Sequence, residues 1–355
     1  MTPRLETLLA AAVRAASGDN TQPWRFAVDP AAGRIALRLD PTRDPSPMNA
    51  GQRMARIAVG AALENLLRTA AANGWPAALE PAAPPDLAAV RLADPAGEPG
   101  RIEDVLARRV TNRRPYDARP VPADLLARLA AATPELDGVT THWITDRPRL
   151  AALAELIGRC DAVMFGEPTM RRAFLSKVRF DRPDAEEVEE GLPLASLEVA
   201  GADRFALRLM PRLPGWLLKA TGGLRVFAKK ARQLVESASG LCLVVAPDDR
   251  PETDLAVGRA MQRAWLALTA EGLAAQPMMS LPVLENALAN GPPELVASLG
   301  RERVRGLGEE FRKLAPEVGG GRPGYLMRFG WAAPPSGRTG RLPPRAVTDE
   351  SAAAG

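Results

Sequence analysis

Three short segments carry side chains whose types and spacing could bind a ligand. The first, Asn20-Thr21-Gln22-Pro23-Trp24-Arg25-Phe26, directly follows an apolar helical pattern. Pro23 cannot continue a helix, and the amides of Asn20 and Gln22 offer donors and acceptors at the turn. Such a turn could hydrogen-bond the polar edge of a heterocycle while Trp24 fills the space below. Taken alone, a helix stop with a packed tryptophan explains the segment better.

The second segment, Arg108-Arg109-Val110-Thr111-Asn112-Arg113-Arg114, contains four arginines in seven residues. Guanidinium groups form fork-shaped, charge-assisted hydrogen bonds, and with the Thr111 hydroxyl they suit a phosphate group. A solvated helix face or loop is the usual alternative for such a run of charge. The third segment, Gly337-Arg338-Thr339-Gly340-Arg341-Leu342-Pro343-Pro344, has on its own the composition of a flexible basic loop.

The composition argues against several other chemistries. The chain of 355 residues contains a single histidine, His142, so no Ser-His-Asp triad can form elsewhere and a His-rich metal site is not expected. Cys160 and Cys242 stand alone without a C-x-x-C motif, so neither a zinc ribbon nor a dithiol redox pair is expected. Two cysteines fit a reducing compartment, and a lone disulfide remains open.

The charge pattern predicts no nucleic-acid partner. The formal net charge is +4, and acidic residues are interleaved with the 41 arginines and 5 lysines along most of the chain. The amino-terminal segment lacks the uninterrupted apolar run of a signal peptide, and no run reaches the roughly 18 apolar residues of a membrane-spanning helix. We therefore expect a cytoplasmic protein without a transmembrane segment.

Hydrophobic periodicity predicts the elements that position these segments. Strands are predicted over 26–29 and 35–39, as a hairpin around Gly33, and over 87–92, 139–145 and 241–246. Helices are predicted over 5–16, about 51–73, 101–109, 123–132, 147–163 and 252–271.

The two long helices indicate an internal duplication. Ala58-Val59-Gly60-Ala61-Ala62 and Ala256-Val257-Gly258-Arg259-Ala260 agree at four of five positions, 198 residues apart. A helix followed by a strand precedes each of them, over 5–29 and 123–145. We therefore expect a first half over 1–100, a second half over 101–345 and a flexible tail over 346–355. Chance agreement between alanine-rich helices is the alternative.

Residues 165–238 have no counterpart in the first half. Their acidic start turns basic, with eight Lys or Arg and no acid between Arg204 and Arg232. Apolar residues at helical spacing, such as Phe205 and Trp216, must be covered by something. We favour an inserted lid subdomain that packs on the body and that the core does not need to fold. Docking of its basic part on an anionic membrane surface is the alternative.

Together the segments resemble the FMN-dependent nitroreductase superfamily, and in particular its long, tandem Acg-type branch. N-T-Q-P-W-R-F after a helix, R-x-T-x-R-R-P-Y before the next unit, A-E-G-L-A-A-Q-P at a helix end and a terminal R-L-P occur in the family's order. The resemblance covers roughly 5–345 and is weaker in the insertion. Ala16-Ser17-Gly18-Asp19 lacks the Pro that usually precedes the first motif in the family, and Asp19 stands before Asn20.

This resemblance implies one cofactor, FMN, and a set of residues that hold it. The basic motif would bind the phosphate and ribityl chain, the carboxy-terminal motif would add a phosphate contact, and the loop after the second long helix would pass the N5 edge of the flavin. The implied cofactor residues are Asn20, Gln22, Pro23, Trp24, Arg109, Thr111, Arg113, Pro277, Met278, Met279, Ser280, Arg338 and Arg341. Many family members carry Glu and Gly where this chain has Met279 and Ser280, so substrate handling is expected to differ.

The resemblance also gives the duplication a purpose. In simple family members two identical subunits share each flavin, one contributing the basic motif and the other the Asn-Gln-Pro-Trp loop. Here the first half keeps only the loop and the second half only the basic motif, because its corresponding turn reads Thr133-Pro134-Glu135-Leu136-Asp137. We expect one composite FMN site per chain, so that one chain suffices, and an oligomer is compatible with this.

The implied fold is α+β: a mixed, mostly antiparallel sheet flanked by helices, in two pseudo-symmetric halves with an inserted lid. The implied function is an FMN-dependent oxidoreductase that uses NADH or NADPH and transfers hydride at flavin N5 to a small nitro or quinone-like substrate. No side-chain acid or base of standard type is evident near the motifs. An FMN-sequestering or sensing protein with little turnover is the alternative, and a flavin-dependent tailoring enzyme is a weaker third.

Overall fold

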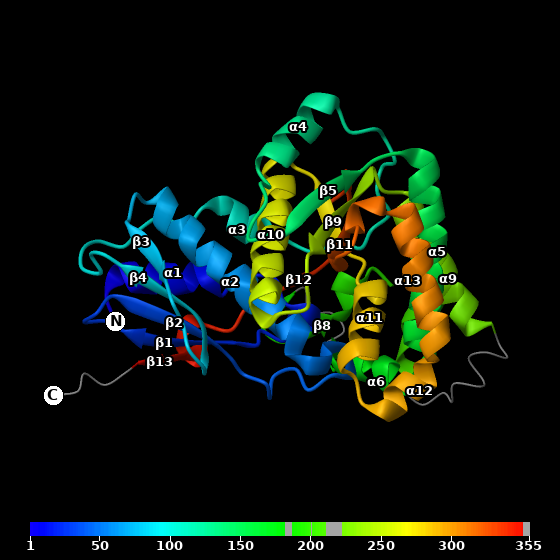
Figure 1. The fold of residues 1–355 in the computed structure, drawn as a ribbon, viewed down its shortest axis with the longest axis horizontal. Helices are drawn as coiled ribbons and strands as arrows, with labels where there is room; N and C mark the ends of the chain where they lie inside the picture. Colours follow the sequence, from blue (N-terminus) through cyan, green and yellow to red (C-terminus); the bar gives the residue numbers. More distant parts are fainter. Residues whose placement is uncertain (182–186, 200, 211–221, 351–355) are drawn as a thin grey trace.

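Two sheets, one on each side of a central helix pair, organise the chain in the computed structural model, which describes residues 1–181, 187–199, 201–210 and 222–350 (Figure 1). The first sheet has the strand order β13-β1-β2-β4-β3. Its strand pairs are antiparallel except for the parallel pair of β1 and β13. The strands are β1 (Trp24–Asp29), β2 (Arg34–Leu39), β3 (Ala77–Glu80), β4 (Asp86–Leu92) and β13 (Thr348–Glu350).

The second sheet is antiparallel throughout, with the order β10-β11-β9-β5. Every residue of β9 and β11 is buried, which explains the continuous apolar run from Leu241 to Ala246. The expected α+β class with mixed, mostly antiparallel sheets is confirmed. Cys160 and Cys242 are buried free thiols, so the disulfide left open by the composition does not form. The strands are β5 (Thr140–Ile144), β9 (Gly240–Ala246), β10 (Ala274–Pro277) and β11 (Arg322–Gly330).

Helices α2 (Arg53–Ala72) and α10 (Pro251–Ala270) pack against each other between the two sheets (Figure 1). They approach most closely at two glycines. A Cβ on Gly60 would lie 2.1 Å from the Leu255 carbonyl oxygen, and a Cβ on Gly258 would lie 1.9 Å from the Ile57 carbonyl oxygen. The two contacts are equivalent. Ile57 and Leu255 are separated by 198 residues, and so are Gly60 and Gly258, so each glycine meets the residue that corresponds to the partner of the other. This symmetry is the one expected of a two-fold pseudo-dimer, and it supports the duplication as a hypothesis.

Of the remaining helices outside the insertion, α1 packs on α2, α3 packs on α10, and α11 packs on α5 and α13. The helical and strand predictions up to α10 match observed elements within a few residues, whereas β3, β11 and the helices after β10 had no prediction. The helices outside the central pair and the insertion are α1 (Pro3–Ala12), α3 (Asp104–Arg108), α4 (Ala123–Ala131), α5 (Arg147–Gly166), α11 (Ser280–Asn290), α12 (Pro293–Leu299) and α13 (Arg301–Leu314).

The flexible tail predicted over 346–355 is wrong for the residues that the structure describes. Thr348–Glu350 form β13, which pairs with Phe26, Ala27 and Val28 of β1, and Val347 is fully buried. An edge strand offers unpaired backbone N–H and C=O groups, and the chain end satisfies those of β1. The chain end therefore contributes a strand to the first sheet, and residues 351–355 lie outside the described part.

The insertion has its own small core and also shares the main one. Leu175, Leu192, Leu194 and Leu207 are buried together. Val235 of α9 is fully buried beside α5 in a second large core, so α9 packs as part of the body, and that the core folds without 165–238 stays a prediction. The elements are α6 (Pro168–Ser176), β6 (Val178–Arg179), β7 (Glu187–Val188), β8 (Leu192–Pro193), α7 (Gly201–Leu209) and α9 (Gly223–Glu236).

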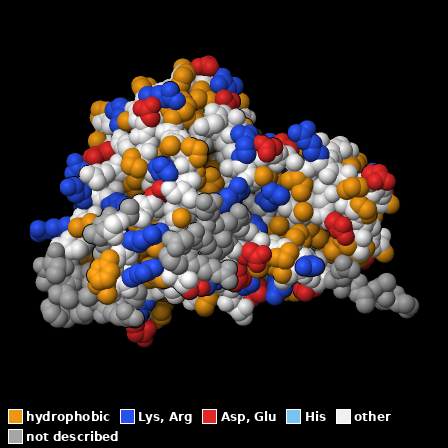
Figure 2. All heavy atoms as spheres, turned by 180° about the vertical axis from the view of Figure 1, so that it is seen from behind, with side chains coloured by type: hydrophobic (Ala, Val, Ile, Leu, Met, Phe, Trp, Pro, Cys, Tyr) orange, Lys and Arg blue, Asp and Glu red, His pale blue; other side chains and the backbone are white. Residues whose placement is uncertain are grey.

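The apolar residues of the insertion are only partly covered. Leu207 and Met210 are buried, but Phe205 is 67% exposed, and Trp216 lies outside the described residues. On the face shown in Figure 2, Lys and Arg side chains are scattered among acidic and apolar ones. Within the described ranges, no helix is long and apolar enough to cross a membrane.

Candidate functional site

The R-x-T-x-R segment runs in extended conformation along the edge of β10. Thr111 forms a parallel bridge with Ala275, and the Asn112 N–H donates to the Ala275 carbonyl over 3.0 Å. Alternate residues of an extended chain face the same side. Arg109, Thr111 and Arg113 accordingly line one cavity, whereas the Asn112 side chain donates to the Ala333 carbonyl. The spacing of the motif therefore decides which of its side chains face the cavity.

That cavity, of about 370 Å³, brings together segments that are far apart in the sequence. The loop after β10 reaches it because Met278 N–H donates to the Leu326 carbonyl of β11 over 2.8 Å. The predicted residues that line it are Asn20, Arg109, Thr111, Arg113, Pro277, Met278, Met279, Ser280 and Arg341.

Four predicted residues, Gln22, Pro23, Trp24 and Arg338, are not part of the cavity lining. Gln22 is fully buried and ties two segments together: its Oε1 accepts from the Leu342 N–H at 2.9 Å, and its Nε2 donates to the Glu189 carbonyl at 2.7 Å. Trp24 is fully buried in the main core, as the plainer interpretation of that segment expected. The Arg338 guanidinium donates to the Ala107 carbonyl.

Buried guanidinium groups form one end of the cavity. Burial lowers the pKa of Arg109 to about 10. Its Nη2 donates to the Arg14 carbonyl, its guanidinium lies 4.8 Å from the Trp265 ring centre, and its Nε has no hydrogen-bond partner among the described residues. Arg113 donates to the Ser196 carbonyl, and burial lowers its pKa as well. In the described part of the chain neither arginine forms an ion pair with a carboxylate, so this end suits an anionic group.

Arg341 joins this end from the carboxy-terminal motif. It donates to the Ala15 carbonyl at 2.8 Å and to the Asn20 Oδ1 at 3.0 Å. The turn that it contacts is strained, because Asp19, Asn20 and Gln22 have φ values of 47°, 56° and 50°. Each such non-glycine residue costs about 1–3 kcal/mol and persists only where its surroundings enforce it, which is common at functional sites.

Three carboxylates in the cavity contradict the expectation that no side-chain acid lies near the motifs. Asp19, Asp44 and Asp161 all line it. Burial raises the pKa of each to about 6, and the charge of Asp44 adds to the rise for Asp19. Asp19 directly precedes a predicted site residue and could have been noticed. Asp44 and Asp161 belong to no motif and reach the cavity only through tertiary packing.

Helices α6 and α9 of the insertion, together with the end of α5, supply an aromatic wall. Phe165 of α5 stacks on Phe227 of α9 with 5.2 Å between the ring centres, and Phe174 of α6 meets Phe165 edge-on at 5.4 Å. All three line the cavity. Another part of the insertion is hydrogen-bonded to the first motif, since the Asn20 side chain donates to the Glu189 carbonyl at 3.0 Å. The insertion therefore covers one side of the cavity.

Arg328, a residue that the sequence analysis missed, fixes the basic motif in place. It is fully buried in β11 and lies over the Tyr116 ring at 3.6 Å. Its guanidinium donates to the Arg114 and Leu234 carbonyls and to the Gln276 side chain, at 2.6, 3.0 and 2.8 Å. Burial lowers its pKa to about 10. The signal available in the sequence was one arginine within the otherwise apolar stretch from Tyr325 to Phe329.

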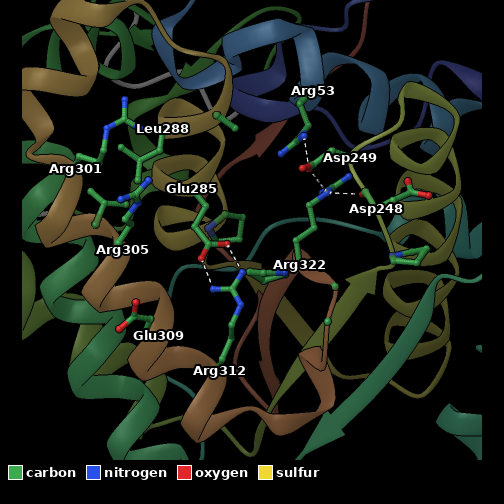
Figure 3. Close-up of a pocket in the computed structure, with 17 residues that line it drawn as sticks. Arg53, Asp248, Asp249, Glu285, Leu288, Arg301, Arg305, Glu309, Arg312 and Arg322 are labelled. Atoms are coloured by element: carbon green, nitrogen blue, oxygen red, sulfur yellow. Dashed lines mark hydrogen bonds and ion pairs between the residues drawn. The ribbon is translucent and has the colours of Figure 1, made fainter.

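A second, larger cavity of about 620 Å³ lies between α11, α13 and the loop after β9 (Figure 3). Part of its charged lining is paired internally. Arg53 and Arg322 both contact Asp249, at 2.7 and 3.0 Å, and Arg312 contacts Glu285 at 2.6 Å. None of the sequence-predicted residues lines this cavity. The smaller cavity is therefore the candidate site.

The comparisons with known proteins give one curated relative. No protein-family model matches the chain. "Uncharacterized protein MT1398" of Mycobacterium tuberculosis is 27% identical over 346 residues, which is 94% of this chain and 46% of that protein. The chain thus spans about half the length of the curated relative it matches.

Solved structures similar to the chain are nitroreductase-like. The FMN-dependent nitroreductase NfnB of Mycobacterium smegmatis, in complex with NADPH, is 15% identical, with 64% of this chain and 86% of that chain covered and a TM-score of 0.34. Iodotyrosine deiodinase bound to FMN and 3-iodo-L-tyrosine is 16% identical, with 67% and 94% covered and a TM-score of 0.36. A nitroreductase with FMN from Bacteroides fragilis is 15% identical, with 65% and 89% covered and a TM-score of 0.33. These likenesses concern the fold alone.

Proposed function

We propose that the protein binds FMN in the cavity of about 370 Å³ and is an oxidoreductase that passes two electrons, as hydride, to a small nitro or quinone-like acceptor. One observation carries the proposal. Alternate residues of the R-x-T-x-R motif, the loop over 277–280 and Arg341 line this cavity together. The volume lies within the usual range for small-molecule sites.

The residues present fit the phosphate of FMN. Arg109 is buried and Arg113 is partly buried, and desolvation lowers the pKa of both, so an anion beside them would stabilise their charged forms. The Nε of Arg109 is buried and has no hydrogen-bond partner among the described residues, so the protein does not saturate this guanidinium by itself. Thr111 and Arg341 line the same end of the cavity and would add hydrogen bonds.

The opposite part of the site would receive the flavin ring. FMN supplies the hydride chemistry when bound, with NADH or NADPH as reductant. Loop 277–280 ends where α11 begins at Ser280, without a side-chain cap, so the first N–H groups of that helix have no acceptor within it. They would orient the ring, and Met261 of α10, which also lines the cavity, would help to exclude water from it.

We further propose that the chain is a tandem member of the nitroreductase superfamily, of the Acg-type branch, with one composite site. The first half contributes Asn20 and the second half contributes Arg109, Thr111 and Arg113. The reciprocal contact of Gly60 and Gly258 supports the pseudo-dimer.

An FMN-sequestering or sensing protein is the second candidate function. It is favoured by the insertion, which lines the cavity with Phe174 and Phe227 and is tied to the motifs by the bond from Arg113 to the Ser196 carbonyl. Such a lid would keep a nicotinamide away from the flavin.

Purification followed by anaerobic mixing tests both candidates. We expect yellow protein that releases FMN on denaturation. Bleaching by NADH or NADPH supports the reductase, and colour that only dithionite removes supports the sequestering protein. Protein that neither carries nor binds added FMN refutes both.

A further inference from the structure

A buried guanidinium beside the candidate site has no countercharge. Arg328 is fully buried, and it forms no ion pair with any carboxylate that the structure describes. The hydrogen bonds that it donates all go to uncharged oxygens, namely the backbone carbonyls of Asn112, Arg114 and Leu234 and the side chain of Gln276. Burial of an unpaired charge is costly, and in a region of low dielectric constant its field acts strongly on nearby groups.

Gln276 connects this charge to the cavity. It lies opposite Arg328 in the antiparallel pair of β10 and β11, and the Arg328 Nε donates to its Oε1 over 2.8 Å. A guanidinium has no acceptor atom, so the amide cannot be turned the other way round. Gln276 also lines the cavity of about 370 Å³. Pairing across the two strands therefore leaves Nε2 as the amide atom that is available to a ligand.

The Nε2 of Gln276 is an accessible donor. The residue is partly exposed, and in the described ranges its Nε2 has no hydrogen-bond partner. The Nε of Arg109 and the Oγ of Ser280 also lack partners, but those atoms are buried, whereas the Nε2 of Gln276 is not. Because Gln276 lines the cavity, this amide can donate to a ligand that enters it.

The place of Gln276 favours the flavin ring over the phosphate. It directly precedes Pro277, where the loop that would receive the ring begins. The phosphate end has charged donors in Arg109 and Arg113, whereas an uncharged amide matches an uncharged acceptor such as a ring carbonyl. A flavin ring gains negative charge when it is reduced, and a donor polarised by a buried cation stabilises that charge.

We propose that Gln276 donates a hydrogen bond from Nε2 to the ring system of the flavin, and that Arg328 raises the reduction potential of the bound flavin through this amide. The inference rests on the proposed function, because it requires FMN in the cavity. Arg328 is a positioning residue: it fixes which amide atom faces the ligand, and its charge polarises that amide. No bond is made or broken by the pair, which changes the driving force of the reaction only.

Titration of apoprotein with FMN and riboflavin in parallel tests the contact. Gln276→Met removes the amide and keeps the length of the side chain, so the two Kd values should rise by the same factor, about 3- to 10-fold. Gln276→Glu keeps an acceptor for the Arg328 Nε and serves if Gln276→Met does not fold; it should weaken both flavins at least as much. Weaker binding of FMN alone would assign Gln276 to the phosphate and overturn the proposal.

The midpoint potential of the bound flavin tests the role of Arg328. In Gln276→Glu the new carboxylate pairs with Arg328 and cancels its charge. The reduced flavin should then lose about tenfold more affinity than the oxidised flavin, which lowers the two-electron potential by about 30 mV. Gln233→Glu, at an exposed glutamine of α9, is the matched control and should leave the potential and both Kd values unchanged. An unchanged potential in Gln276→Glu would overturn the role of Arg328.

NMR of side-chain amides gives a readout that depends on neither turnover nor affinity. The Nε2 proton signals of Gln276 in apoprotein, identified by their loss in Gln276→Met, should shift when riboflavin is added. Signals that stay in place at saturating riboflavin would overturn the contact and leave the proposed function standing. Protein that binds neither FMN nor riboflavin would overturn both.

Discussion

Replacing Arg109 by alanine should separate the phosphate of FMN from the rest of the flavin. Arg109 is 6% exposed and forms no ion pair within the described residues, so a bound phosphate would be its first anionic partner. A hydrogen bond to a charged group contributes about 1.5–3 kcal/mol, so losing one should raise the Kd for FMN about 10- to 150-fold. Riboflavin has no phosphate, and its Kd should change by less than about threefold.

The measurement is a titration of flavin fluorescence with apoprotein, using FMN and riboflavin in parallel. Arg108→Ala is the matched control, because Arg108 is half exposed and pairs with Asp104 on the surface. It should leave both Kd values unchanged.

The variant must be shown to be folded, since Arg109 also packs over Trp265 and holds the Arg14 carbonyl. Circular dichroism at the titration temperature provides this check. Arg109→Lys keeps the charge without the fork and should fall between wild type and Arg109→Ala. If FMN and riboflavin weaken equally in Arg109→Ala, or if Arg108→Ala weakens FMN as strongly, the phosphate lies elsewhere and our reasoning is refuted.

Four further outcomes are expected. Gly258→Ala should lower the free energy of unfolding in urea by about 1–3 kcal/mol, because its Cβ would lie 1.9 Å from a backbone oxygen. Gly306→Ala, in open space on α13, should raise it by about 0.5–1 kcal/mol. Equal effects of the two substitutions would contradict the close helix contact. Arg328→Met should lower the free energy of unfolding by about 3 kcal/mol or more, because the buried Leu234 and Arg114 carbonyls lose their hydrogen-bond donor. A loss below about 0.5 kcal/mol would show that these carbonyls find other donors. Burial raises the pKa of Asp44 to about 6, so its carboxyl binds a proton more tightly in the folded protein, and the stability gained from this is lost as the pH rises from about 4 through 6. Asp44→Asn should therefore raise Tm at pH 7.5 and not at pH 4. The reverse result would exclude a raised pKa. Denatured protein should release one FMN per chain, and two flavins per chain would contradict the composite site.

Local patterns determined much of the fold. The alternation in β1, the continuous apolar run of β9 and the long helices α2 and α10 were all predictable, because hydrophobic period and length can be read from consecutive residues. The pairing of the chain end with β1 was not predictable from the sequence. Whether Thr348–Glu350 fray or pair depends on a free strand edge more than 300 residues earlier in the chain, and no local signal reports this.

The candidate site divides in the same way. The spacing of Arg109, Thr111 and Arg113 by itself determined that the three would share a face once the segment was extended, and the motif with its order along the chain pointed to a phosphate. Tertiary structure alone decided that Arg341 reaches this face, that Trp24 is buried away from it, and that Asp161 and Ser280 are neighbours in the cavity lining. The physical reason is that residue type and period act over a few residues. A cavity, and the burial that shifts the pKa of a carboxyl in it, exist only after elements distant in the sequence have packed.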